Sequence, residues 1–318
     1  MEKDLLNIGL AQIAPVWLNK EKTIEKIIHY IKIAADRSCD LIVFGEALLP
    51  GYPFWLTKTD GAKFNSELQK EIFSKYFRES IQINEGDLKA ICNTAKESKI
   101  PIYLGMIERA EDRGNHSLYC TLTFIDANGE IRSTHRKLVP TYEERLVWSN
   151  GDGKGLHVHK IKEFTAGGLN CWENWMPLVR SSLYAQGENL HIAVWPGNIK
   201  NTKEITRFIA MESRSFVASV SSILRKEDID KNIPYYDLII SNSEDMIFNG
   251  GTCLSAPDGS WIVEPVINKE ALITAKIDME QIRRERQNLD ISGHYSRPDV
   301  THLTVNRTRQ GIVDFIEK

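Results

Sequence analysis

The chain has 318 residues, of which 42% are hydrophobic and 26% are charged, fractions typical of a soluble globular protein with one large α/β domain or two medium ones. Its net charge of −3 and the lack of a basic tract give no support for binding nucleic acid. No stretch approaches the ~20 apolar residues of a membrane helix, and the N-terminus does not resemble a signal peptide.

Short apolar runs alternate with helical patterns in the first half of the chain. Leu5–Ile13 is predicted to be a strand, and Lys20–Arg37, with apolar residues at helical spacing, an amphipathic helix. Asp40–Phe44 is typical of a strand that is buried on both faces. Further helices are predicted at 68–77 and 87–98, and a strand at 101–107. Residues 118–131 (LYCTLTFIDANGEI) predict two strands around an Asp-Ala-Asn-Gly turn.

The second half repeats this order of strands, helices and a hairpin. Strands are predicted at 156–161, 191–195, 217–224 and 272–277, helices at 177–186, 202–215 and 279–287, and a hairpin around Pro-Asp-Gly at 250–263. A loop-rich stretch is expected to lead to Cys171. No Pro/Gly/Ser linker divides the chain, so we expect a single domain over residues 1–318, with two similar halves. Two sheets face to face with helices outside would account for both the strand–helix units and the hairpins.

The five cysteines are Cys39, Cys92, Cys120, Cys171 and Cys253. Their number is odd, their spacing is wide, and no two form a CxxC pair. This pattern argues against a disulfide framework or a structural zinc site, and it favours a reducing cytoplasm.

Cys171 is the first candidate for chemistry. It lies in GGLNCWEN, at a predicted strand-to-helix turn, where the amides of a helix N-terminus lower the pKa of a thiol and stabilise a developing oxyanion. The alternative is a buried structural thiol.

Glu46, Lys137 and Glu144 are the other candidates. Glu46 directly follows the buried strand at 40–44, at the end of a strand where α/β sheets bind ligands, and a carboxylate in a partly apolar setting could act as a base. Lys137 follows the first hairpin, and a buried ammonium there could stabilise negative charge in a transition state. The alternatives are a loop acid for Glu46, a solvated edge strand for Lys137, and a surface ion pair with Arg145 for Glu144.

Other polar residues give weaker signals. His157 and His159 share one face of a strand but have no third ligand at an obvious spacing, so no metal site is predicted. The glycines at 151, 153 and 155 match neither nucleotide-binding pattern, so no nucleotide cofactor is predicted. A Cys–His pair with His191 or His294 as the base stays open.

Three segments together resemble the nitrilase superfamily, and specifically its nitrilase branch. They are FGEALLPGYP around Glu46, HRKLVPTYEERLVW around Lys137 and GGLNCWENWMP around Cys171. Further matches are GLAQIAPVW near the start, VWPG at 194–197 and GHYSRPDV at 293–300, so the similarity covers nearly the whole chain. It implies an α/β fold, the four-layer αββα sandwich with two mixed sheets covered by helices.

The resemblance also implies a function. It assigns a catalytic triad to Glu46, Lys137 and Cys171, with Glu144 as a further carboxylate, and no cofactor. The Trp that follows the nucleophile resembles nitrile-acting members, which convert an organic nitrile to the acid and ammonia through a thioimidate and a thioester. Gly45 stands where many relatives have Pro, and we expect this to alter the local loop and not the chemistry.

Several expectations accompany this function. Tyr52, Trp172 and Trp195 are predicted to form the pocket wall, with core packing as the alternative. The expected partners are a small nitrile and further copies of the chain, in a homodimer or larger homo-oligomer. Rival hypotheses are an amidase or cyanide-hydrolysing member of the same superfamily, and a scaffold with this fold that has lost catalysis.

Overall fold

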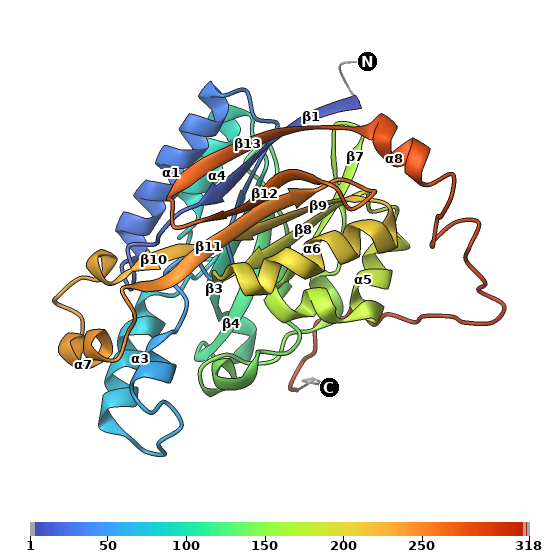
Figure 1. Ribbon diagram of the computed structural model, residues 1–318. Helices are drawn as coiled ribbons and strands as arrows, with labels where there is room; N and C mark the ends of the chain where they lie inside the picture. Colours follow the sequence, from blue (N-terminus) through green and yellow to red (C-terminus); the bar gives the residue numbers. More distant parts are fainter. Residues whose placement is uncertain (1–3, 314–315, 317–318) are drawn as a thin grey trace.

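Residues 4–313 and 316 are described by the computed structural model of the protein, and they form two β-sheets enclosed by helices (Figure 1). The first sheet has the strand order β13-β1-β2-β3-β4-β5, and the second has the order β10-β11-β9-β8-β7-β6, with β12 paired to β11. The strands of the first sheet are β1 (Leu5–Gln12), β2 (Leu41–Phe44), β3 (Ile102–Ala110), β4 (Ser117–Ile125), β5 (Ile131–Arg136) and β13 (Ala271–Asp278). Those of the second are β6 (His159–Ile161), β7 (Phe164–Asn170), β8 (Leu190–Trp195), β9 (Phe216–Ser221), β10 (Ile223–Arg225), β11 (Met246–Ser255) and β12 (Trp261–Ile267).

Both sheets are built on the same plan. In the first, β1, β2 and β3 run parallel and the hairpin β4–β5 continues the sheet. In the second, β7, β8 and β9 run parallel and the hairpin β11–β12 follows them. The repeated plan matches the two similar halves expected from the sequence, and it brings the carboxyl ends of corresponding strands to one end of the molecule.

Helices cover the outer face of each sheet. Figure 1 shows α1 and α4 on one side of the paired sheets, and α5 and α6 on the other. The helices are α1 (Lys20–Asp36), α2 (Trp55–Lys58), α3 (Glu67–Glu79), α4 (Lys89–Ser98), α5 (Pro177–Tyr184), α6 (Ile199–Ser213), α7 (Tyr236–Ser241) and α8 (Met279–Glu285). In α1 the side chain of Asn19 caps the first turn, and Ile27, Ile31 and Ala34 form a buried stripe, as a helix with one apolar face requires.

The largest apolar cluster lies between the two sheets. It combines side chains such as Leu10 and Val43 of the first sheet with Ile192 and Val220 of the second, all of them fully buried. A separate cluster joins α1 and α4 to the outer face of the first sheet, and another joins α6 to β8 and β9. The four-layer αββα sandwich predicted from the sequence is therefore confirmed.

The main error of the sequence prediction is β7, because Phe164–Asn170 forms a fully buried strand where a loop-rich stretch was expected. Its two glycines weaken the strand signal, yet the packing requires them. A Cβ on Gly168 would lie 2.7 Å from a methyl carbon of Leu122 in the opposite sheet. The glycine therefore allows the sheets to approach where β7 ends at the site described below.

Other differences are smaller. The strand expected at 156–161 shortens to β6, because its pairing with β7 begins only at His159. The strand expected at 217–224 divides into β9 and β10, and α7 was not predicted.

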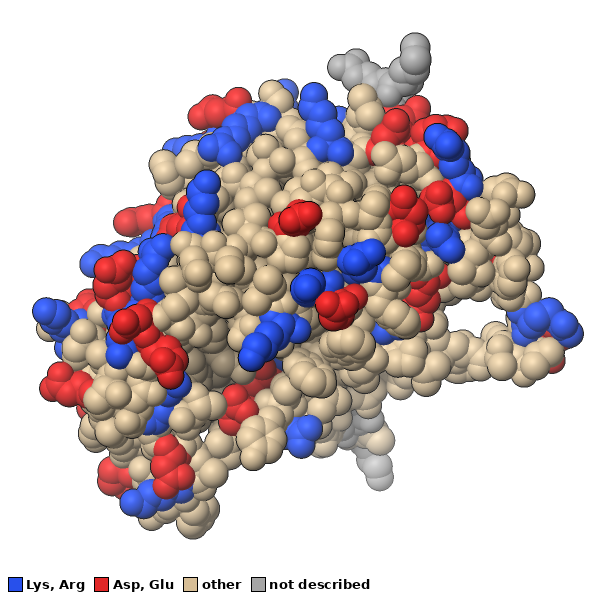
Figure 2. Space-filling model, viewed as in Figure 1, with Lys and Arg blue, Asp and Glu red and all other residues tan. Residues whose placement is uncertain are grey.

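The segment after α8 is an extended arm without helix or strand, as far as residue 313. It leaves the end of α8, stands away from the body and returns below α5 (Figures 1 and 2). Arg309 attaches the returning part, because its guanidinium lies 3.0 Å from Oδ1 of Asp152. On the face in Figure 2, basic and acidic side chains are interspersed. Among the described residues, no helix has both the length and the apolar character needed to cross a bilayer.

Candidate active site

Glu46 follows β2 at the end of the first sheet, and its side chain is 1% exposed. Its backbone N–H donates to the carbonyl oxygen of Trp195, at 3.2 Å, which links it to the second sheet. Two glycines permit this close packing. A Cβ on Gly105 would lie 2.7 Å from Cα of Glu46, and one on Gly45 would lie 2.7 Å from Oγ of Ser222. The backbone around Glu46 is thus fixed between β3 and the second sheet.

Lys137 follows β5, and its backbone N–H donates to the carbonyl oxygen of Cys120, at 2.8 Å. Its ammonium donates to Oε1 of Glu46 at 2.8 Å and to Oε2 of Glu144 at 2.7 Å. Nζ also lies 5.5 Å from the centroid of the Trp148 ring. With only 1% of Lys137 exposed, the alternative of a solvated edge strand is wrong, and the ammonium bridges two buried carboxylates.

Glu144 lies in a 3₁₀ turn after β5, and it is 1% exposed. It forms a capping box with Thr141, whose backbone N–H donates to Oε2 of Glu144. The hydroxyl of Tyr52 donates to its Oε1, at 2.9 Å. The alternative of a surface ion pair with Arg145 is therefore wrong, and three donors, including Lys137, hold the carboxylate of Glu144 in place.

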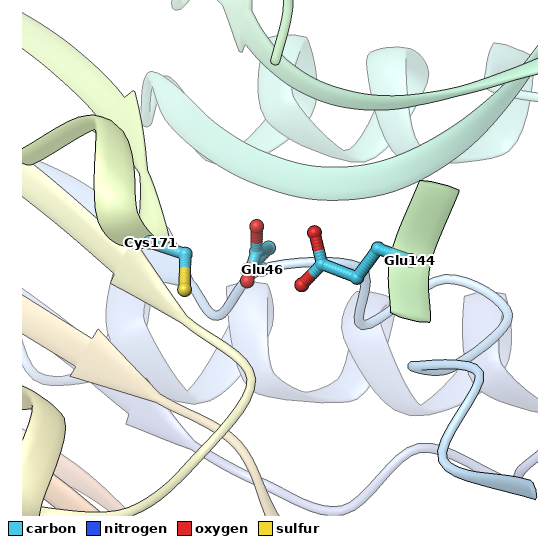
Figure 3. Close-up of side chains that lie close together, drawn as sticks. All are labelled: Glu46, Glu144 and Cys171. Carbon is cyan, nitrogen blue, oxygen red and sulfur yellow. The ribbon is translucent and has the colours of Figure 1, made fainter. Parts of the chain in front are cut away.

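Cys171 begins the 3₁₀ turn Cys171–Trp175 directly after β7, and it is 3% exposed. Its φ of 46° lies in the left-handed region, which a residue other than glycine adopts only when its surroundings impose it. The side-chain amide of Asn174 donates to the carbonyl oxygen of Cys171, at 2.8 Å. Figure 3 shows the thiol pointing toward Glu46, with Glu144 beyond, and the sulfur and one oxygen of each carboxylate all lie within 4.8 Å of one another.

The charges in this cluster set its protonation. Burial raises the pKa of Glu46 to about 7, the neighbouring Lys137 acts against the rise, and Glu144 adds to it. Burial also raises the pKa of Cys171 well above its ordinary value, and Glu46 adds to this effect, while Lys137 and the backbone N–H of Trp172 oppose it. Burial alone would lower the pKa of Lys137, but Glu46, Cys171 and Glu144 raise it well above its ordinary value. The resting site therefore holds a thiol, an ammonium and a carboxyl group that titrates near neutral pH.

Comparison with known proteins identifies the family of the chain. Residues 7–287 match the model of the carbon-nitrogen hydrolase family. The chain belongs to this family. A protein called nitrilase 2, from an unknown prokaryotic organism, is 35% identical over 311 residues, which cover 98% of this chain and 95% of the relative. The aliphatic nitrilase of Sinorhizobium fredii (strain HH103) is 33% identical, with coverage of 96% and 97%.

A solved structure shows the same fold. The protein XC1258 of Xanthomonas campestris, described as a member of the CN-hydrolase superfamily, superposes with a TM-score of 0.68 at 15% identity, over 91% of this chain and 96% of that one. The match to the family model and the two nitrilase relatives confirm the superfamily expected from the sequence, and the chain is a hydrolase of carbon–nitrogen bonds.

The three aromatic residues predicted for the pocket wall of this carbon-nitrogen hydrolase differ in their surroundings. Tyr52 contacts the cluster through its bond to Glu144. Trp195 is fully buried and donates to Oγ of Ser219, so it packs in the core behind Cys171. The side chain of Trp172 is 55% exposed.

Sequence reasoning missed two neighbours of the ammonium–carboxylate cluster. Trp148 packs edge-on against Tyr52, with 5.6 Å between ring centroids, and lies beside Lys137. The thiol of Cys120 donates to Oε1 of Glu46, at 3.4 Å. Trp148 is the last residue of the motif HRKLVPTYEERLVW, and this position could have indicated that it lies near the site. Cys120 lies on a strand, and nothing in the sequence distinguishes it from a structural thiol.

The two candidate histidine bases are placed differently from Glu46. His191 is buried, and its ring nitrogens lie 3.0 Å from Oε1 of Glu188 and 2.8 Å from Oδ1 of Asn174, so both nitrogens are occupied. His294 is exposed on the C-terminal arm. Glu46, together with Glu144, is thus a basic group that the fold brings to Cys171.

Glu46, Glu144 and Cys171 could in principle offer three ligands to a metal ion. The ammonium of Lys137 already binds both carboxylates, so a metal ion would have to compete with a buried cation for the same two carboxylates. The donor set therefore suits an ammonium better than a metal.

Proposed function

We propose that this protein is a nitrilase, which hydrolyses an organic nitrile to the carboxylic acid and ammonia. One observation carries the proposal: the buried ammonium of Lys137 binds Glu46 and Glu144 beside the thiol of Cys171. A nucleophile, a base and a cation for developing negative charge are the groups that addition to a carbon–nitrogen multiple bond requires. The names of the two relatives support the nitrile as the substrate.

The first step joins the nitrile to the enzyme. Glu46 takes the proton of Cys171, and the thiolate attacks the nitrile carbon. The electron pair displaced from the triple bond moves to nitrogen, where Lys137 and the backbone N–H of Trp172 stabilise the growing charge. Protonation of that nitrogen gives a thioimidate. The raised pKa of Glu46, about 7, suits this exchange because a base is most effective when its pKa is close to the working pH.

Two molecules of water complete the reaction. Glu46 takes a proton from the first water, which adds to the thioimidate carbon, and ammonia leaves to give a thioester. The second water attacks the thioester in the same way, so the carboxylic acid leaves and Cys171 regains its proton. We assign Glu144 to holding Lys137 and guiding the water. Tyr52 and the exposed Trp172 are proposed to contact the organic group, and the buried Trp195 to support the wall from behind.

The test uses a matched pair of cysteine variants. Cys171→Ala should abolish ammonia release from a panel of aliphatic, aromatic and arylaliphatic nitriles, because the nucleophile is absent. Cys253→Ala is the control: Cys253 is also buried, but its thiol contacts Thr206. Mass spectrometry of wild-type protein quenched during turnover should show an acyl or imidoyl adduct on the peptide that contains Cys171.

The outcomes separate the hypotheses. Full activity of Cys171→Ala would eliminate the mechanism. Hydrolysis of the matched amides but of no nitrile would identify an amidase, release of product from cyanide alone would identify a cyanide hydrolase, and inactivity of the wild-type protein on every substrate would favour the scaffold.

We also infer that the protein assembles as a homodimer or larger homo-oligomer in the cytoplasm. Four large apolar side chains on and beside α5 and α6 are at least 40% exposed: Trp175, Leu178, Phe208 and Met211. Exposed apolar groups of this size are typical of surfaces that bind another protein. All five cysteines are free, in keeping with a reducing compartment. Light scattering on the purified protein tests the assembly, and a monomer at micromolar concentration would contradict it.

A further inference from the structure

A second buried carboxylate, two residues after Cys171, binds the segment that carries Lys137. Glu173 is 1% exposed. Its Oε1 accepts the backbone N–H of Leu138, at 2.8 Å, and its Oε2 accepts the backbone N–H of Asn170, at 3.0 Å. The Nε2 of His135 lies 3.1 Å and 3.0 Å from these two oxygens.

These partners come from both sides of the site. His135 and Leu138 stand on either side of Lys137 in the first sheet and the loop after it. Asn170 directly precedes Cys171 at the end of the second sheet. The carboxylate of Glu173 therefore connects the chain on both sides of the ammonium to the turn of the thiol, across the junction of the two sheets.

The environment keeps this carboxylate ionised. Burial would raise the pKa of Glu173, but His135 and the N–H groups of Leu138 and Asn170 outweigh burial and hold the pKa below its ordinary value. A buried anion with this many donors is costly to remove, because each donor is then left without its partner. The backbone N–H groups that donate to Glu173 belong to two segments, one that carries Lys137 and one that carries Cys171. The separation of these two segments sets the distance from Nζ of Lys137 to Sγ of Cys171.

We propose that Glu173 is a positioning residue that holds the ammonium of Lys137 at a fixed distance from the thiol of Cys171, with His135 completing its attachment to β5. This inference rests on the proposed function, in which the two groups act together. The backbone of Cys171 also requires neighbouring groups that hold it in place. Its φ of 46° lies in the left-handed region, which is unfavourable unless neighbouring groups impose it. A displacement of about 1 Å at a reaction centre can reduce the rate by about 100-fold.

Alkylation of Cys171 by iodoacetamide tests the distance without requiring turnover. The rate is measured against pH by mass spectrometry of the Cys171 peptide, in wild type and Glu173→Gln. Displacement of the ammonium raises the pKa of the thiol, so a smaller fraction of the thiol is ionised at any pH below that pKa. We expect labelling of Glu173→Gln at pH 8 to be about tenfold slower, which corresponds to a loss of ~1.4 kcal/mol of interaction with the thiolate.

The sign of the change is informative. Loss of a nearby negative charge would by itself lower the pKa of the thiol and accelerate labelling, so slower labelling identifies displacement. His135→Phe, which keeps the two backbone bonds of Glu173, should slow labelling in the same direction by a smaller factor. In a Lys137→Met background, Glu173→Gln should not slow labelling, because no ammonium is left to position and only the accelerating effect of the lost negative charge remains.

One control and one fallback variant complete the experiment. Leu6→Ala opens a cavity at the amino end of β1, far along the strand from the site, so it should lower the melting temperature and leave the labelling rate unchanged. If Glu173→Gln does not fold, His135→Phe is used for the same measurement. Labelling of the folded variants that is unchanged or faster, or that slows equally with and without Lys137, overturns the proposal. Failure of the proposed function would instead appear as normal labelling of wild-type Cys171 without hydrolysis of any nitrile.

Discussion

Replacement of Lys137 by Met tests the centre of the proposed site most directly. Met keeps an unbranched side chain of similar length and removes the ammonium that binds Glu46 at 2.8 Å and Glu144 at 2.7 Å. One hydrogen-bond donor aimed at developing charge typically contributes a factor of ~10²–10³ to kcat. We therefore expect kcat for nitrile hydrolysis to fall at least ~100-fold, since the ammonium is a charged donor in a water-poor site.

The same substitution should also change stability in a pH-dependent way. Removing one partner of a buried ion pair costs ~3–5 kcal/mol when the other partner stays charged. The pKa of Glu46 is already raised to about 7, and loss of Lys137 raises it further. Because the folded value lies above the unfolded value of ~4.3, the cost is absent at low pH and grows as pH rises through the folded pKa.

The assays are ammonia release and thermal melting of wild type and variant at pH 5.5 and pH 8.5. The difference in melting temperature should be larger at pH 8.5. Lys276→Met, which alters an exposed lysine on β13, should change neither quantity. A loss of kcat below about tenfold would refute transition-state stabilisation by Lys137, and a melting difference that does not depend on pH would refute a charge-based cost.

Two further predictions concern Glu46. In wild type, kcat/KM should fall about tenfold per pH unit below about 7, because protonation of Glu46, whose pKa is about 7, removes the base; a plateau down to pH 5.5 in the rate profile would contradict this role. Gly105→Ala places a Cβ 2.7 Å from Cα of Glu46, so we expect a loss of ~1–3 kcal/mol in unfolding free energy and a kcat at least tenfold lower. Chemical denaturation and steady-state kinetics measure both quantities, and wild-type values for this variant would show that the close packing is unimportant.

Much of the fold follows from local patterns. The buried stripe of α1, the short apolar strand β2 and the Asp-Ala-Asn-Gly turn between β4 and β5 each carry their signal in a few neighbouring residues. Strand β7 does not, because Gly167 and Gly168 are present for contacts with other parts of the chain: a Cβ on Gly167 would meet the carboxylate of Glu188, and one on Gly168 would meet Leu122. The intrinsic strand propensity of a short segment does not indicate a packing requirement that comes from a residue far away in the sequence.

The site shows the same division. Residue type and position after a strand made Glu46, Lys137 and Cys171 candidates, and the likeness to a known family assigned them, with Glu144, to one site. The aromatic neighbours were harder, since Trp148 lies beside the ammonium while Trp195 is in the core. Whether an aromatic ring faces a cavity depends on how several helices and strands pack together. The sequence of one element therefore does not predict it.

By itself, the sequence determined the family, most of the order of strands and helices, and the chemical groups at the strand ends. The tertiary structure alone decided that a buried ammonium joins two carboxylates beside a thiol, and that Glu173 ties the two segments of this cluster together. The physical reason is that protonation and hydrogen bonding depend on burial and on distances between residues far apart in the chain, such as Glu46 and Lys137 at 91 positions, and these arise only when the two sheets pack face to face.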